Sequence, residues 1–218
     1  MRRLSITIGT VLTVALSATG ASAAGNTFHF KASGPGAEAF WSTCSTFQPG
    51  PNTVCTDTFL FTADQAVRED GTRFQDTFLF VDQFTYKFDR RGNFIFISET
   101  FGFASGQDVS LSVDRDLSTA NVNATVALET CTEERGGFIC TSAGTGEVSA
   151  SWTGVGEVFK VSSRSTFKTK TFMERFTFKG SFRDAIATGE LDGVDFGDLL
   201  FADIFNATSS DLFVCHNC

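Results

Sequence analysis

Apolar and polar residues alternate along most of this chain, and the alternation is clearest where phenylalanine is most frequent. From Phe74 to Phe88 the eight even positions hold six aromatic residues and two aspartates, while the odd positions mix polar and aliphatic residues. A period of two places the even set on one face of a β-strand. Because phenylalanine buries a large area without needing a hydrogen-bond partner, we expect this face to line a dry interior.

Two glycine-containing turns predict how this strand pairs with its neighbours. The Asp-Gly pair at 70–71 is typical of a two-residue hairpin turn, and it places Phe61 opposite Phe80. A second turn at 91–92 places Phe80 opposite Phe103, which keeps all three rings on one face. The same turns pair Val67 with Phe74, Ala63 with Phe78, Tyr86 with Ile97 and Phe88 with Ile95. The sequence therefore predicts a meander of three strands, over about residues 56–67, 74–89 and 94–104.

Similar alternation recurs in the second half of the chain. Apolar positions alternate from Val122 to Leu128 and from Val148 to Trp152, and a phenylalanine stripe runs from Phe172 to Phe182. The apolar residues change from even positions before the glycines of 154–156 to odd positions after them, which indicates a bulge or a corner. No long segment has apolar residues at helical spacing. We expect an all-β fold, an antiparallel meander that forms a barrel or a strongly coiled sandwich.

The first 23 residues have the features of an export signal. Arg2 and Arg3 precede an apolar run, and small residues at 21–23 supply a cleavage site. The expected mature protein is a single all-β domain over residues 24–218, secreted or extracytoplasmic, from a bacterium. No later segment approaches the length of a transmembrane helix. An outer-membrane barrel is disfavoured because one Tyr and two Trp cannot form aromatic belts, and because the chain carries six cysteines.

All six cysteines follow this signal, and an even number in an exported chain predicts three disulfides. A turn at 135–136 places Cys131 opposite Cys140, with Cα atoms about 4.5 Å apart. We therefore favour a Cys131–Cys140 bond, together with Cys44–Cys55 across a loop that contains glycine and proline. Each bond is expected to stabilise the fold by at most a few kcal/mol.

The last two cysteines, Cys215 and Cys218, form a Cys-His-Asn-Cys motif at the end of the sequence. A structural disulfide is favoured over a redox motif, which needs a helix N-terminus, and over a metal site, which needs further ligands. His29 and His216 are the only histidines, and there is no Gly-x-Ser-x-Gly motif. A Ser-His-Asp hydrolase is therefore disfavoured, and we assign no catalytic or metal-binding residue.

Carboxylates are the better enzymatic candidates. Asp76, Asp82 and Glu174 share the parity of the phenylalanine stripes, so each is expected to face inward. A carboxyl in an apolar pocket has a raised pKa, and a pair of them suits glycoside hydrolysis. The favoured alternative is that water reaches them at a rim or a bulge. The three aspartates at 192–198 lie around glycines, and a plain acidic turn is favoured there over a calcium site.

The formal net charge is −8, and loss of Arg2 and Arg3 with the signal makes it −10, since 15 basic residues then face 25 acidic ones. Such a protein repels nucleic acid, so we expect no nucleic-acid partner. One basic cluster departs from this balance, and a solvated sheet face is favoured there over a binding site. Its members are Arg164, Lys168, Lys170, Arg175 and Lys179.

Three segments, Leu117–Thr125, Ser151–Gly156 and Gly180–Gly189, resemble a loose group of uncharacterised exported β-rich proteins of actinobacteria and other soil bacteria. The similarity covers roughly the C-terminal half of the chain. It implies an exported bacterial β-protein, and it transfers no activity and no site residue. The phenylalanine-rich meander lies outside the similarity.

The leading interpretation is an exported non-enzymatic β-domain that serves as a binding or envelope-associated module. One alternative is a carrier of a small hydrophobic ligand in a phenylalanine-lined barrel. Another is a secreted hydrolase that depends on carboxylates. No cofactor is expected. The ligand-binding candidates of the carrier alternative are Phe61, Phe78, Phe80, Phe84 and Tyr86.

Overall fold

The structure is a computed structural model that describes residues 27–44, 50, 52–134 and 137–215. It consists of β-strands and one 3₁₀ turn, with no α-helix among these residues, so the all-β prediction is confirmed. The elements are β1 (Thr27–Ser42), β2 (Val54–Glu69), β3 (Thr72–Phe88), β4 (Phe94–Ser105), η1 (Gly106–Asp108), β5 (Val109–Val113), β6 (Thr119–Glu134), β7 (Gly137–Gly154), β8 (Phe159–Lys168), β9 (Phe172–Leu191), β10 (Val194–Asp195) and β11 (Asp198–Cys215). The predicted signal at 1–23 lies outside the described residues.

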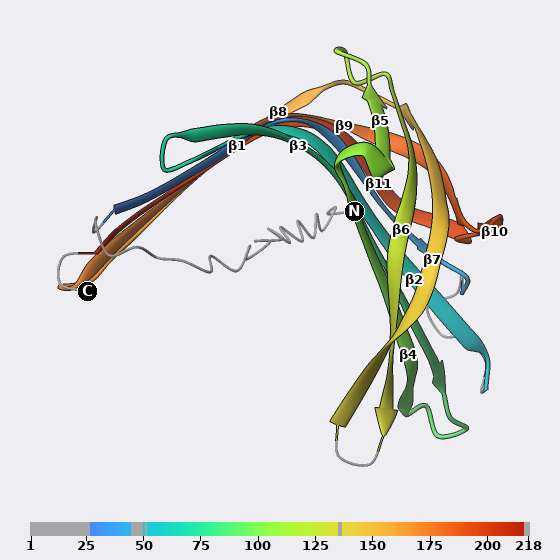
Figure 1. The fold of residues 1–218 in the computed structure, drawn as a ribbon. Coiled ribbons are helices and arrows are strands. Elements are labelled where there is room, and N and C mark those ends of the chain that lie inside the picture. Colours follow the sequence, from blue (N-terminus) through green and yellow to red (C-terminus); the bar gives the residue numbers. More distant parts are fainter. Residues whose placement is uncertain (1–26, 45–49, 51, 135–136, 216–218) are drawn as a thin grey trace, which may run out of the picture.

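Eight of the described strands close into a ring, in the order β1-β2-β3-β4-β6-β7-β9-β11, and β11 pairs with β1 again. Every neighbouring pair in the ring is antiparallel. Three strands lie outside this path: β5 pairs with β6, and β8 and β10 pair with β9 (Figure 1). The meander predicted for the first half of the chain is therefore one part of a closed sheet.

The interior of the ring is packed with aliphatic side chains, two tryptophans and one phenylalanine. Every ring strand contributes buried residues to this core, among them Ala39, Leu60 and Val122. Trp41 and Trp152 are each 1 % exposed, and both indole N–H groups donate to backbone carbonyls. A closed ring of eight strands leaves an interior just wide enough for side chains, and alanine-rich walls with three large aromatic side chains, Trp41, Trp152 and Phe196, fill it.

Five ring strands continue beyond the ring and form a curved sheet with β8, in the order β3-β2-β1-β11-β9-β8, and Figure 1 shows this sheet extending to the left. We call this part the extension. It comprises β8 together with residues 72–77, 63–69, 27–36, 205–215 and 172–182. No second layer of the described strands covers either face of the extension. The same strands thus pass from a closed ring into an open sheet.

Glycines make this change of curvature possible. A Cβ atom added to Gly36 would lie 2.5 Å from the Thr62 carbonyl oxygen and 2.5 Å from the Phe205 ring, and one added to Gly34 would overlap the Asp64 carbonyl oxygen. Only glycine leaves room for such an approach of neighbouring backbones. The sheet therefore folds toward the face on which Phe205 lies.

The register predicted from the first turn is confirmed, and the second is only partly correct. Phe61 lies opposite Phe80, and Phe80 opposite Phe103. Nearer the second turn, Tyr86 pairs with Phe96 instead of Ile97, and Phe88 pairs with Phe94 instead of Ile95. The Asp89 carboxylate accepts hydrogen bonds from the backbone of Arg91 and Asn93, which builds a longer turn than predicted. A bulge opposite Thr85 and Tyr86 then restores the expected register.

The parity change predicted at 154–156 corresponds to a corner. Strand β7 ends at Gly154, and β8 begins at Phe159. Both pair with β9, β7 through residues 185–191 and β8 through residues 173–182. The residues Val148, Ala150 and Trp152 of β7 point into the core, as their alternation predicts. The corner therefore moves the chain from the ring into the extension.

Candidate functional site

The aromatic residues that the sequence marks as ligand-binding candidates lie on the sheet face opposite the core. Phe61, Phe78, Phe80, Phe84 and Tyr86 alternate with inward residues such as Leu60, Leu79 and Val81. The expected inward orientation of this stripe is therefore wrong. The narrow ring interior accepts alanine, valine and leucine from most strands, and the phenylalanines take the other face. We call this other face, on the outside of the ring and along the extension, the phenylalanine face.

Six rings form a continuous band across the phenylalanine face, from β4 to β8. Successive ring centroids are 5.6–6.1 Å apart, which is the range of favourable aromatic contact. Between β2 and β11 the band passes over Gly36, whose missing side chain lets the two flanking rings meet. In order, the band consists of Phe103, Phe78, Phe61, Phe205, Phe182 and Phe159.

The band is buried at its centre and open at its ends. Phe78 and Phe205 are 9 % and 5 % exposed, whereas Phe103 and Phe159 are 46 % and 44 % exposed. No described strand covers these rings. A contiguous apolar surface of this kind is typical of an interaction site in a monomeric protein.

A second aromatic cluster lies at the other end of β3, beyond the ring. Phe84 and Tyr86 pack against Phe94 with centroids 5.9 Å and 5.3 Å away, and Phe96 contacts Phe138 on β7. Burial raises the pKa of Tyr86, as do the charge of Asp57 and a side-chain hydrogen bond to it. Four of the five sequence candidates are therefore divided between the band and this cluster, and Phe80 lies on the same face, opposite Phe61 on β2 and Phe103 on β4.

The three carboxylates chosen from the sequence do not converge. Asp76 and Asp82 share β3 with the stripe but lie six residues, or about 20 Å, apart along the strand. Glu174 lies opposite Phe213, on β9 in the extension, four strands away from β3. Burial raises the pKa of Asp82 to about 6, with a further contribution from Glu99. The separation that a glycosidase pair needs is thus not met by these three residues.

A different row of carboxylates lies beside the aromatic band, and the sequence analysis missed it. Glu38 is opposite Phe61 on one side and Asp203 on the other, and Asp203 is opposite Asp184. Burial, and then the charge of Asp203, raise the pKa of Glu38 to about 7. Burial and the neighbouring Asp184 raise the pKa of Asp203 to about 6. The three side chains come from three different strands, so no local spacing in the sequence predicts that they meet. The one signal is alternation, because Glu38 is two residues from Phe40 and Asp203 is two residues from Phe205, which places them on the phenylalanine face.

This row is a set of neighbouring carboxylates on three adjacent strands. Among the described residues no group of His, Cys, Asp and Glu side chains has the arrangement of a metal site. Two shallow hollows on the surface, one lined by residues of β8 and β9 and the other in part by residues 115–117, include none of these three carboxylates. The row therefore gives the middle of the aromatic band, beside Phe61, Phe205 and Phe182, a border of carboxyl groups with raised pKa values.

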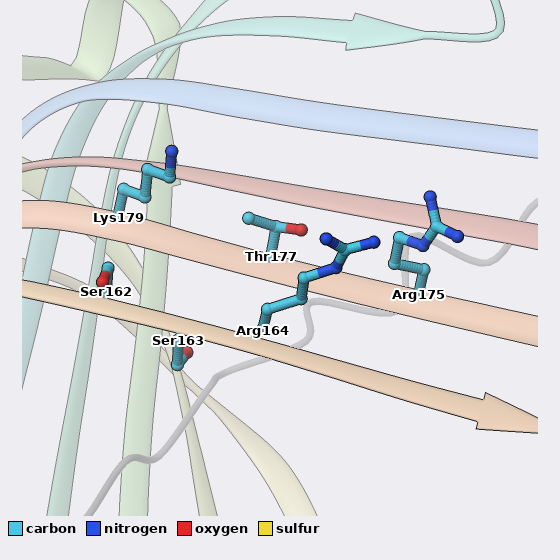
Figure 2. Close-up of a pocket in the computed structure, with 6 residues that line it drawn as sticks. All are labelled: Ser162, Ser163, Arg164, Arg175, Thr177 and Lys179. Atoms are coloured by element: carbon cyan, nitrogen blue, oxygen red, sulfur yellow. The ribbon is translucent and has the colours of Figure 1, made fainter.

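Most of the basic cluster lies on the opposite side of the extension. Arg164 and Lys168 on β8, and Arg175 and Lys179 on β9, point away from the phenylalanine face, while Lys170 lies in the turn between the two strands. Figure 2 shows Arg164, Arg175 and Lys179 projecting to the same side of this strand pair. They line a shallow hollow of about 400 Å³ together with Ser162, Ser163 and Thr177. The predicted single face for these four cations is confirmed.

Two of the three predicted disulfides are present. Cys44 bonds to Cys55, and Cys131 bonds to Cys140, with the latter two residues directly opposite each other on β6 and β7. Cys215 is disulfide-bonded, and its predicted partner Cys218 lies outside the described residues. Disulfides of this kind indicate an environment outside the cytoplasm.

The acidic turn at 192–198 has the hydrogen bonds of a structural turn. The Asp192 carboxylate accepts a bond from the Glu147 backbone N–H, and the Asp195 carboxylate accepts one from Gly197. Elsewhere, the His29 ring contacts the Ser210 hydroxyl at 3.2 Å. His216 lies outside the described residues.

Comparison with protein-family models, with curated proteins and with solved structures gives no match to this chain. In the described residues no helix is long and apolar enough to cross a membrane. The largest surfaces of the described residues that no second layer covers are the two faces of the extension.

Proposed function

We propose that this protein is an exported, non-enzymatic binding module whose ligand surface is the phenylalanine face. The supporting observation is the band from Phe103 to Phe159, which is continuous over six rings and is covered by no described strand. Burying such a surface against an apolar ligand releases water from it and favours association. The disulfides agree with a protein that works outside the cytoplasm.

The chemistry of the face favours an apolar ligand with an uncharged or cationic end. Phenylalanine side chains offer no hydrogen bonds, so the band selects apolar shape. At its edge Glu38, Asp203 and Asp184 add hydrogen-bond acceptors and negative charge. A lipid or another amphiphilic component of the cell envelope has this combination of parts.

The two alternatives have less support. A carrier needs a hollow interior, but the ring interior is filled by Trp41, Trp152, Phe196 and aliphatic side chains, and the phenylalanines of the band lie outside it. A carboxylate-dependent hydrolase needs two carboxylates in a cleft, whereas Asp76, Asp82 and Glu174 are dispersed over the sheet.

Native mass spectrometry of the oxidised protein with a bacterial lipid extract tests the proposal. We expect a reproducible bound mass, and we expect the double substitution Phe103→Ser/Phe159→Ser to weaken its binding by at least about tenfold, because the rings lie at the open ends of the band. Both residues are more than 40 % exposed, so the fold should tolerate the change.

Val194→Ser/Leu200→Ser is a matched control, since both side chains are exposed and neither belongs to the band. This variant should bind like the wild type. Protein free of lipid at every lipid concentration, or equal losses in both variants, would show that the phenylalanine face is not the ligand surface.

A further inference from the structure

The side of the extension opposite the phenylalanine face carries an unusual concentration of positive charge. Strand pairing places eight of the chain's 17 lysines and arginines on this side, although the chain as a whole has a net charge of −8. We call it the basic face. Its cations are Lys31, Arg68, Arg73, Lys160, Arg164, Lys168, Arg175 and Lys179.

The fold itself does not neutralise these charges. Lys31, Arg68 and Arg73 lie directly opposite one another on three adjacent strands, an arrangement that costs free energy through like-charge repulsion. The one carboxylate on this face, Asp64, already accepts hydrogen bonds from Gln75 and Thr77. Within the described part of the chain none of the eight cations forms an ion pair. A surface of this kind attracts anions from outside the protein.

On β8 and β9 the cations alternate with hydroxyl groups. Arg164 lies opposite Thr177, and Arg175 lies opposite Thr166. In the same way, Lys179 lies opposite Ser162, and Lys160 lies opposite Ser181. In this checkerboard four of the five cations that β8 and β9 contribute to the basic face have a hydroxyl group as their cross-strand neighbour, and the fifth, Lys168, lies opposite Met173.

The hollow in Figure 2 lies at the centre of the checkerboard. The Nε atom of Arg175 is buried there and has no hydrogen-bond partner among the described residues. A guanidinium group binds a carboxylate, sulfate or phosphate through two parallel hydrogen bonds, and the adjacent hydroxyls accept or donate further ones. The site is therefore suited to a ligand that carries both oxyanions and hydroxyl groups.

The dimensions of the basic face favour a polymer over a small ion. From β3 to β8 the face is about 24 Å wide, and from Lys160 to Lys168 it is about 26 Å long. A membrane fits less well, since the cations and the phenylalanines lie on opposite sides of one sheet and cannot both meet a single lipid surface.

We propose that the basic face binds a linear acidic polysaccharide, whose repeated carboxylate or sulfate groups pair with the cations while its sugar hydroxyls meet the serine and threonine side chains. This site lies on the reverse of the sheet from the phenylalanine face, so the proposal stands independently of the proposed lipid-binding function.

Titration of the oxidised protein with polygalacturonate, followed by calorimetry, tests this proposal, with neutral dextran as the ligand control. We expect binding in about 50 mM salt that weakens by at least about tenfold in 200 mM salt, because cations on the protein displace the counterions of the polymer. Dextran should not bind.

Arg164→Gln/Arg175→Gln/Lys179→Gln should reduce the affinity for polygalacturonate by at least about tenfold, since it removes the cations of the hollow. The matched control Lys87→Gln/Arg90→Gln/Arg91→Gln removes the same charge from the far end of β3 and the following turn. It should bind within about twofold of the wild type. Arg164→Lys/Arg175→Lys keeps the charge and should recover only part of the affinity, because lysine lacks the guanidinium fork.

The proposal would be overturned by no binding of polygalacturonate in low salt, by equal losses in the two charge-removing variants, or by binding to anionic lipid vesicles without binding to the polymer. Equal affinity for duplex DNA would also overturn it, because the hydroxyl pattern would then play no role. Phe103→Ser/Phe159→Ser should bind polygalacturonate normally, which separates this site from the phenylalanine face.

Discussion

The ring and the extension share most of their strands, yet they bury apolar surface in different ways. In the ring, β1 points Ala37, Ala39 and Trp41 inward, where they pack in the core and are at most 1 % exposed. In the extension, the same strand carries Phe28 and Phe30, which are only half-buried because no described layer lies over them. The ring therefore has a complete core, and the extension has two exposed faces of opposite character.

This difference indicates a division of roles. A closed core of small residues and two tryptophans contributes most of the stability, because packed interiors gain both apolar burial and dispersion contacts. A single sheet with an aromatic face and a basic face gains little from its own packing, and it offers two large surfaces to ligands. We expect substitutions in the ring to affect folding and substitutions in the extension to affect binding.

The largest effect should follow from Trp152→Ala in the ring. It removes a side chain that is 1 % exposed and leaves the Glu38 carbonyl without its 3.0 Å hydrogen bond, so we expect a loss of about 4 kcal/mol in the free energy of unfolding. Urea denaturation measures this loss. Phe103→Ala should cost less than about 1 kcal/mol by the same assay, because this ring is nearly half exposed. Similar losses in both variants would mean that the band is part of the core.

A smaller effect is expected at the boundary between the two regions. In Gly36→Ala the new Cβ would lie 2.5 Å from the Thr62 carbonyl oxygen, so β1 and β2 must separate, at a cost of about 3 kcal/mol. Gly50→Ala is the control, because its nearest neighbour would be a side-chain oxygen of Thr53 at 3.7 Å. Thermal unfolding of both variants checks this prediction. An unchanged midpoint for Gly36→Ala would exclude the close approach of the two strands.

The smallest effect depends on pH and concerns the carboxylate row at the same boundary. Because folding raises the pKa of Glu38 to about 7, the native state binds this proton more tightly than the unfolded state, and stability falls as the pH rises from about 5 to about 8. Glu38→Gln should therefore match the wild type at about pH 5 and exceed its stability by at most about 3 kcal/mol at about pH 8.

Thermal unfolding across this pH range measures the difference, and Glu133→Gln is the control because Glu133 is an exposed carboxylate on β6. Both pKa values of the Glu38 and Asp203 pair are raised, so Glu38→Gln should flatten the profile without abolishing its slope. A profile unchanged by Glu38→Gln would show that Glu38 stays ionised in the native state.

Strand positions and several contacts could be predicted from local patterns. The register of β2 with β3 follows from one Asp-Gly turn, and the Cys131–Cys140 bond follows from the hairpin around 135–136. The second turn was predicted less well, because the Asp89 carboxylate organises a longer loop whose effect on register is not visible in residue alternation.

The sequence by itself determined an all-β chain with two distinct sets of residues on its strands, because a period of two separates the faces of any strand. Only the tertiary structure decided which set faces the core, since alternation does not specify toward which side a sheet closes. Closure of the ring selected the small side chains for the interior, and Gly34 and Gly36 allowed the phenylalanine face to form the inner side of a bend. The carboxylate row and the basic face likewise required two strand pairings. The pairing of β1 with β11 joins residues more than 150 positions apart in the chain, and the pairing of β9 with β11 joins residues more than 15 positions apart.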